Sequence, residues 1–152
     1  MGGIDVIFID GLHLFEQVVL DIENSLQYLN DGGVILVHDC NPLTENASVR
    51  AYTSEEVAAM NLPNWVNIWN GDVWKAIVQL KATRTDLDIM VINTDHGVGI
   101  IRKGTVKDVL PLTKEQAAQL TYQDLDNNRV KYLDLKDKEY FSTFIKEFEA
   151  VR

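Results

Sequence analysis

The fold of this chain is decided by residues 4–11, Ile4-Asp5-Val6-Ile7-Phe8-Ile9-Asp10-Gly11, an apolar run that ends on a carboxylate and a glycine. A run with so little polar alternation is typical of a strand that is covered on both faces of a parallel sheet. A second apolar run, residues 34–37, ends on His38 and Asp39. The segment between the two runs has apolar residues at helical spacing: Phe15, Val18, Val19, Ile22, Leu26 and Leu29. We therefore expect a strand–helix–strand unit with a right-handed crossover.

The end of this helix and the ends of the two strands are marked by their residue types. Residues 30–33, Asn-Asp-Gly-Gly, are expected to stop the helix, with left-handed backbone geometry at the glycines. Asp10 and Asp39 lie at the carboxyl ends of the strands, the edge where ligands bind in open α/β sheets. If the strands are neighbours, they lie ~4.8 Å apart, so both carboxylates could share one ligand or cation. Capping of loops or helix starts is an equally good interpretation of both residues.

Three further side chains at these strand ends are candidates for chemistry. His13 follows Asp10-Gly11 in the turn, and it is either a base or ligand, or a solvated residue at the helix entry. Gly11 allows the backbone to bend sharply at this point. Cys40 could act as a nucleophile only with an activating base, for which His38 is close in sequence. We favour a buried structural thiol for Cys40.

Composition limits the classes of function. The 152 residues suit a single domain, 1–152, with a sizeable core, and 46% of them are hydrophobic. The net charge of −9, from 14 basic and 23 acidic residues, disfavours broad surfaces for nucleic acid or anionic membranes. Cys40 is the only cysteine, so an internal disulfide is excluded and a cytoplasmic location is expected. We expect neither nucleic acid nor a membrane as a partner.

The middle of the chain is polar and irregular between residues 43 and 70, apart from a short helix expected at 54–60. Its tryptophans, Trp65 and Trp69, either line a substrate pocket or serve only as packing. Gly71-Asp72 then leads into a helix, in which Val73, Ala76, Ile77 and Leu80 have helical spacing. We expect Asp72 to cap this helix and Lys75 to be solvated.

The last third of the chain contains a hairpin and helices. Residues 89–93 and 98–102 are apolar runs joined by a short turn at 94–97, which favours two antiparallel strands. The turn enters a strand rather than a helix, so we reject a phosphate-binding loop there. Helices are expected at 114–120, 122–132 and 138–151, and the last of these has an aromatic docking face.

Four ordered motifs resemble one enzyme family. They are Ile7-Phe8-Ile9-Asp10-Gly11-Leu12-His13, Gly32 to Pro42, Asn70 to Ala76, and Asp95-His96-Gly97-Val98-Gly99. Together they resemble the second half of a class I S-adenosylmethionine-dependent methyltransferase, in a small bacterial branch. The resemblance covers residues 4–102 and implies an α/β fold, an incomplete Rossmann-like sheet of strands four to seven, with the last strand antiparallel and helices flanking it. Residues 105–152 would be a helical extension.

The resemblance also implies a site. Metal-dependent relatives hold a cation with carboxylates at the exits of strands four and five, and Asp10 and Asp39 match these positions. Asp10 and Gly11 would contact S-adenosylmethionine, and Asp10, His13, His38 and Asp39 would form the catalytic group, with a histidine as base. Mg²⁺ is the cation that the resemblance suggests, although Mg²⁺ prefers oxygen ligands and a histidine-rich set favours a transition metal. The expected reaction is methylation of a small-molecule hydroxyl.

The chain departs from the family in one large respect. The family's first half, with the glycine-rich loop and the acid that binds the cofactor ribose, has no counterpart in these residues. We therefore expect half of the cofactor site to be missing and the chain alone to be inactive. Residues 4–10 would then form an apolar sheet edge that favours either self-association or association with a separate N-terminal half. The alternatives are a non-catalytic interaction module and, with less support, a metal-dependent hydrolase.

Overall fold

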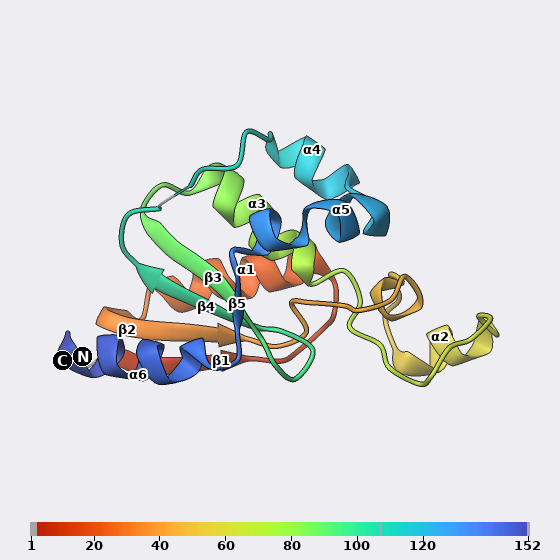
Figure 1. Ribbon diagram of the computed structural model, residues 1–152, viewed down its shortest axis with the longest axis horizontal. Helices are drawn as coiled ribbons and strands as arrows, with labels where there is room; N and C mark the ends of the chain where they lie inside the picture. The colour runs from red at the N-terminus through yellow and green to blue at the C-terminus, as the bar shows by residue number, and fades with distance from the viewer. Residues whose placement is uncertain (1–2, 107, 152) are drawn as a thin grey trace.

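The computed structural model describes residues 3–106 and 108–151, which contain a five-stranded sheet with helices on both faces (Figure 1). The strand order is β1-β2-β4-β3-β5. The strands span Ile4–Ile9 (β1), Leu29–Val37 (β2), Leu87–Asn93 (β3), Val98–Lys103 (β4) and Leu135–Asp137 (β5). The helices span Phe15–Leu26 (α1), Ser54–Ala59 (α2), Trp74–Thr83 (α3), Lys114–Gln119 (α4), Tyr122–Leu133 (α5) and Tyr140–Ala150 (α6), and a 3₁₀ turn covers Asn46–Ser48 (η1).

The directions of the strands confirm the predicted fold class. β1 and β2 are parallel, while β4 is inserted antiparallel between β2 and β3. The hairpin of β3 and β4 is therefore as expected from its short turn. β5 was not predicted, because a three-residue strand has too little pattern to distinguish it from a loop, and it pairs parallel to β3.

The two faces of the sheet are covered unequally. On one face, α1, α3, α4 and α5 pack into a large core that includes Ile22, Trp74 and Ile77. On the other face, α6 covers a much smaller cluster consisting of Val34, Met90, Ile92, Ile100 and Phe144. Figure 1 shows α6 alone below the sheet, with the other packed helices above it.

The structure corrects the prediction for the end of the first helix. α1 ends at Leu26, and Leu29 is a buried residue of β2 rather than the last residue of the helix face. Gly32 does have a left-handed φ of +79°, but it lies within β2. The register between β1 and β2 shifts there, from Ile4 opposite Leu29 to Val6 opposite Val34. The left-handed backbone of Gly32 therefore belongs to an irregularity within the strand.

The first strand is also not covered on both faces, as its sequence had suggested. Ile7 and Ile9 face α1, whereas Ile4, Val6 and Phe8 point away from it and are exposed, Phe8 by 59%. β1 pairs only with β2, so its outer edge has no strand partner among the described residues. One face of β1 is therefore apolar although the described residues leave it uncovered.

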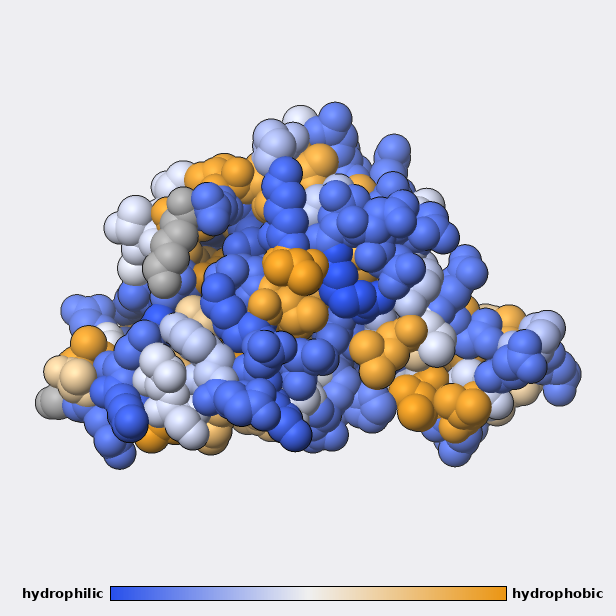
Figure 2. Space-filling model, viewed as in Figure 1, coloured by the Kyte–Doolittle hydropathy of each residue, from blue (hydrophilic) through white to orange (hydrophobic). Residues whose placement is uncertain are grey.

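The segment between β2 and α3 extends away from the sheet. It carries η1 and α2, and it forms the projection on the right in Figure 1. Large apolar side chains are exposed along it: Leu43, Tyr52, Met60, Val66 and Ile68. Figure 2 shows hydrophobic patches on this part of the surface. Among the described residues, the helices all lack the length and apolar character needed to cross a bilayer.

Candidate functional site

Asp10 and Asp39 meet at the carboxyl ends of the parallel strands β1 and β2. Asp10 follows Ile9 at the end of β1, and His38-Asp39 follows Val37, the residue that pairs with Ile9. The Nδ1 atom of His38 lies 3.4 Å from Oδ1 of Asp10 and 3.2 Å from Oδ2 of Asp39. The two acids are therefore neighbours, as the strand ends predicted.

His13 joins this group from the turn that precedes α1. Its Nε2 atom lies 3.1 Å from Oδ2 of Asp39 and 3.8 Å from Oδ1 of Asp10. Its ring packs against the indole of Trp69, with 4.7 Å between the ring centroids. We refer to Asp10, His13, His38 and Asp39 as the carboxylate–histidine cluster.

Asp39 is buried, and its side chain is held by a hydrogen bond. Only 4% of it is exposed, and its φ of +62° lies in the left-handed region, which aspartate tolerates better than most residues. The Nδ2 atom of Asn70 donates a 2.6 Å hydrogen bond to Oδ1 of Asp39. Thus one oxygen of Asp39 is bound by Asn70, and the other faces the two histidines.

The charges around His38 favour its protonated form. Burial lowers the pKa of His38, but attraction by Asp39, Asp10 and Asp95 outweighs burial and raises the pKa above its ordinary value. Asp95 belongs to the turn between β3 and β4, and its Oδ2 atom lies 3.4 Å from Nε2 of His38. His38 is thus placed between carboxylates on both sides of its ring.

The carboxylate–histidine cluster lines an open hollow of about 460 Å³. The projecting segment supplies the other wall with Asn67, Ile68, Trp69 and Asn70, and His96 adds a side chain from the β3–β4 turn. A second hollow of about 460 Å³ runs along the outer edge of β1, between Phe8 and the α1 residues Asp21 and Asn24. Asp10 lines both hollows, and Gly11 lines the second one.

The cluster also has the geometry of a small cation site. One ligand atom each from Asp10, His13 and Asp39 lies within 4.8 Å of the other two. Two carboxylates and an imidazole are a mixed donor set, which suits Mn²⁺ or Fe²⁺ better than Mg²⁺. The residues present therefore fit a divalent cation, and His13, which the sequence offered as a base or a ligand, is the third donor.

Cys40 is a structural residue. Its side chain is fully buried, and its Sγ atom donates a 3.3 Å hydrogen bond to the carbonyl oxygen of Val37. Burial raises the pKa of the thiol far above its ordinary value, so the thiolate that a nucleophile needs is disfavoured. The preferred prediction, a buried thiol, is confirmed.

Asp72 caps a different helix from the one expected. Its Oδ1 atom accepts a 2.9 Å hydrogen bond from the backbone N–H of Phe15, the first residue of α1, while α3 begins after Val73 without a side-chain cap. The prediction was wrong because the bond joins residues 57 positions apart, which no local pattern encodes. Lys75 is also not simply solvated, since its Nζ atom donates to the carbonyl oxygen of Ala118 and burial lowers its pKa.

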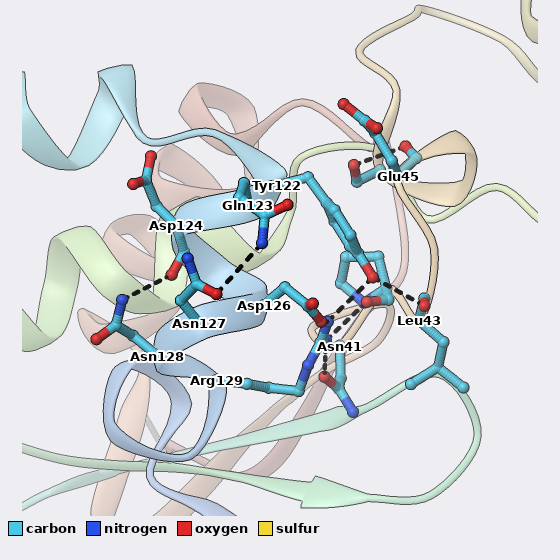
Figure 3. A network of polar contacts seen from close by, with 12 residues as sticks. Asn41, Leu43, Glu45, Tyr122, Gln123, Asp124, Asp126, Asn127, Asn128 and Arg129 are labelled. Atoms are coloured by element: carbon cyan, nitrogen blue, oxygen red, sulfur yellow. Dashed lines mark hydrogen bonds and ion pairs between the residues drawn. The ribbon is translucent and has the colours of Figure 1, made fainter.

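The loop after Asp39 is fixed by α5, as Figure 3 shows. Arg129 donates 2.7 Å hydrogen bonds from Nη1 to Oδ1 of Asn41 and to the carbonyl oxygen of Pro42. The hydroxyl of Tyr122 donates to the carbonyl oxygen of Leu43 at 2.8 Å. α5 therefore holds the exit of β2, a role that its sequence had not suggested.

Sequence reasoning missed several residues that line the site. Asn70, Asp95 and His96 had been named only as members of motifs or of a turn, and not as residues of the site. Each comes from a segment far along the chain from residues 10–39. The signal available for Asp95 and His96 was the position of their turn. Because β4 is antiparallel to both β2 and β3, residues 94–97 lie at the same edge of the sheet as the end of β2. Trp69, by contrast, had been considered as a pocket residue.

Comparison with known families gives a match at the start of the chain. Residues 1–40 match a family model described as a methyltransferase domain. The match covers β1, α1, β2 and the strand ends that carry the carboxylate–histidine cluster. The comparison with curated proteins gave no significant match. At this coarse level, a methyltransferase is the activity that the comparisons support.

Proposed function

We propose that the chain carries the acceptor side of an S-adenosylmethionine-dependent methyltransferase that methylates a hydroxyl group of a small molecule. The observation that carries the proposal is the convergence of two carboxylates and two histidines at the carboxyl ends of β1 and β2. The methyltransferase-domain match over the same residues supports it.

The two hollows beside Asp10 suit a reaction between two molecules. The hollow along β1, next to Gly11, would take part of the methyl donor, and the hollow at the cluster would take the acceptor. Trp69 and Ile68 would pack against the acceptor and exclude water from one side. Holding the two reactants on either side of Asp10 is the kind of orientation that supplies much of the catalysis in such a transfer.

His13 is the better candidate for the base. A base must be unprotonated when the acceptor binds, and the raised pKa of His38 keeps that ring protonated over more of the neutral range. His13 lies 3.1 Å from Asp39, which can orient the imidazole and stabilise the proton that it accepts. His38 would then act as a donor or counter-charge between Asp10 and Asp39.

Asp10 and Asp39 are the residues that would hold a divalent cation. His13 would either complete the donor set or act as the base, because its Nε2 atom cannot do both at once. When bound, such a cation would orient the acceptor hydroxyl and make its deprotonation easier. The mixed donor set leads us to propose Mn²⁺ rather than Mg²⁺ as the preferred ion.

The proposal is tested by titration calorimetry with S-adenosylmethionine, followed by transfer of a labelled methyl group to a panel of hydroxyl compounds. Binding that is lost in Asp10→Ala supports the cofactor assignment, and methyl transfer that is lost in His13→Ala supports the base. Transfer at the wild-type rate by the His13→Ala variant would refute the assignment of the base. Binding of the cofactor with unchanged affinity by Asp10→Ala would refute the placement beside β1.

One observation favours a second function, that of an interaction module which needs a partner for cofactor binding. β1 offers an unpaired edge and three exposed apolar side chains, Ile4, Val6 and Phe8. Such an edge readily pairs with another strand, from a second copy or from a separate N-terminal half. Light scattering with Val6→Lys beside wild type tests this. Concentration-dependent association that disappears in Val6→Lys supports it, and a wild-type monomer that binds S-adenosylmethionine on its own argues against it.

A further inference from the structure

Three consecutive residues, Asn70-Gly71-Asp72, connect the two turns that carry His13 and Asp39. Asn70 donates to Oδ1 of Asp39 at 2.6 Å. The backbone N–H of Asp72 donates to the carbonyl oxygen of His13 at 3.3 Å, and its side chain accepts from the N–H of Phe15. We call residues 70–72 the clasp, because they bind one turn at each end.

Gly71 allows the clasp to lie directly against His13. Its φ of +63° is in the left-handed region, which favours glycine. A Cβ atom at this position would overlap the carbonyl oxygen of His13 and press on its Cβ atom. A side chain at residue 71 would therefore displace the His13 backbone, and this makes the glycine a requirement of the local geometry.

The clasp is itself firmly held and buried. The N–H groups of Asn70 and Gly71 both donate to the carbonyl oxygen of Ala47, at 2.8 and 3.1 Å. Oδ2 of Asp72 accepts a 2.8 Å hydrogen bond from Arg50. Asn70 is only 1% exposed, and burying so many polar groups costs free energy unless their partners are in place.

Trp69, the residue before the clasp, continues the same arrangement. Its indole packs on the His13 ring, and its Nε1 atom donates to the carbonyl oxygen of Val49 at 2.8 Å. His13 is thus fixed through its backbone by Asp72 and through its ring by Trp69. Asp39, the partner of His13, is fixed by Asn70.

We propose that the clasp is a positioning device that sets the His13 ring against Asp39 by joining the β1–α1 turn to the exit of β2. The inference rests on the proposed function for the use of His13 as a base, but the geometry it predicts can be measured without any activity. Asn70, Gly71 and Asp72 are positioning residues, since they act through His13 and Asp39.

The test compares Asn70→Ala and Gly71→Ala with wild type by nuclear Overhauser contacts between the ring protons of His13 and Trp69. We expect these contacts in wild type and their loss in both variants. Where methyl transfer is measurable, we expect kcat to fall about 100-fold, the loss that a misplaced reacting group typically causes, with KM unchanged. Wild-type contacts in both variants would overturn the proposal.

Asn30→Ala is the matched control. Asn30 also donates an amide hydrogen bond to a carboxylate, Asp5, at 2.9 Å, but near the opposite end of β1. It should lower the free energy of unfolding without changing the His13–Trp69 contacts. If Asn30→Ala abolishes these contacts as well, the clasp has no specific role. If wild type shows the contacts but binds neither S-adenosylmethionine nor a hydroxyl compound of the panel, the proposed function fails while the clasp stands.

Discussion

Carboxylates gather in two kinds of place in this molecule, and their counter-charges differ. In the carboxylate–histidine cluster, the described ion pairs of Asp10 and Asp39 are with histidines, without a lysine or an arginine. Two arginines instead hold two carboxylates each. Arg102 of β4 pairs with Asp88 of β3 and Glu147 of α6, and Arg84 at the end of α3 pairs with Glu23 and Asp86. Arginine stays charged at every relevant pH, whereas histidine changes its charge near neutrality. The arginine pairs therefore keep their charges at every relevant pH, whereas the charge of the cluster changes near neutrality.

The largest expected difference between the two kinds of place is in cation binding. Asp39→Asn should weaken the binding of Mn²⁺ by at least about 10- to 100-fold, since changes even to outer partners of metal sites cost that much. Asp88→Asn removes the same charge beside Arg102 and should leave the affinity unchanged. Calorimetry on both variants decides this. Equal losses in the two variants, or a wild type that does not bind Mn²⁺, would remove the distinction.

Removing a permanent cation should have the next largest effect, on stability rather than on binding. Arg102 lies 2.6 Å from Asp88, and both side chains are largely buried. Arg102→Met would leave the Asp88 carboxylate without this partner, and should lower the free energy of unfolding by about 1–3 kcal/mol. Asp10→Asn, at an acid without an arginine partner, should change it by less than about 0.5 kcal/mol. Urea denaturation of both variants measures the difference, and a larger loss in Asp10→Asn would reverse the comparison.

The sequence predicted the half of the site that is local in the chain. Asp10, His13, His38 and Asp39 lie at the ends of two apolar runs, and parallel pairing of those runs is enough to bring them together. The hairpin of β3 and β4 followed from its short turn in the same way. These inferences needed only strand periodicity and the geometry of parallel sheets.

The other half of the site depends on contacts that no local pattern encodes. The bond from Asn70 to Asp39 spans 31 residues, and the bond from Phe15 to Asp72 spans 57. The uncovered face of β1 was missed for a related reason, because an apolar strand has the same sequence whether or not another element covers it. Periodicity describes what a segment could bury, and the tertiary structure decides what it does bury.

The stability of the fold should depend on pH in opposite directions at the cluster and at the arginine pairs. The pKa of His38 is raised above 6.5, so its contribution to stability is complete below that pH and is lost as the pH rises through the folded-state pKa. Hydrogen bonding to Arg84 lowers the pKa of Asp86 below 3.8, despite an opposing effect of burial. Its contribution is therefore complete above 3.8 and is lost as the pH falls through the folded-state value.

This difference can be measured in metal-free protein as the midpoint of urea unfolding against pH. His38→Gln should remove the decline on the neutral side and leave the acid side unchanged, and Asp86→Asn should do the opposite. A wild-type midpoint that does not decline above pH 6.5, or a decline that persists in His38→Gln, would contradict the charge assignment in the cluster.

The smallest effect is expected at the more exposed arginine pair. Arg84 makes 2.6 and 2.7 Å contacts with Glu23 and Asp86, yet these acids are 40% and 64% exposed, so water and salt compete for them. Arg84→Met should therefore cost at most about 1 kcal/mol, and the loss should shrink in 1 M salt. Denaturation at low and high salt measures both quantities. A salt-independent loss equal to that of Arg102→Met would mean that exposure does not matter here. The buried and the exposed arginine pairs would then contribute equally to stability, and only the acids paired with histidine would differ from them.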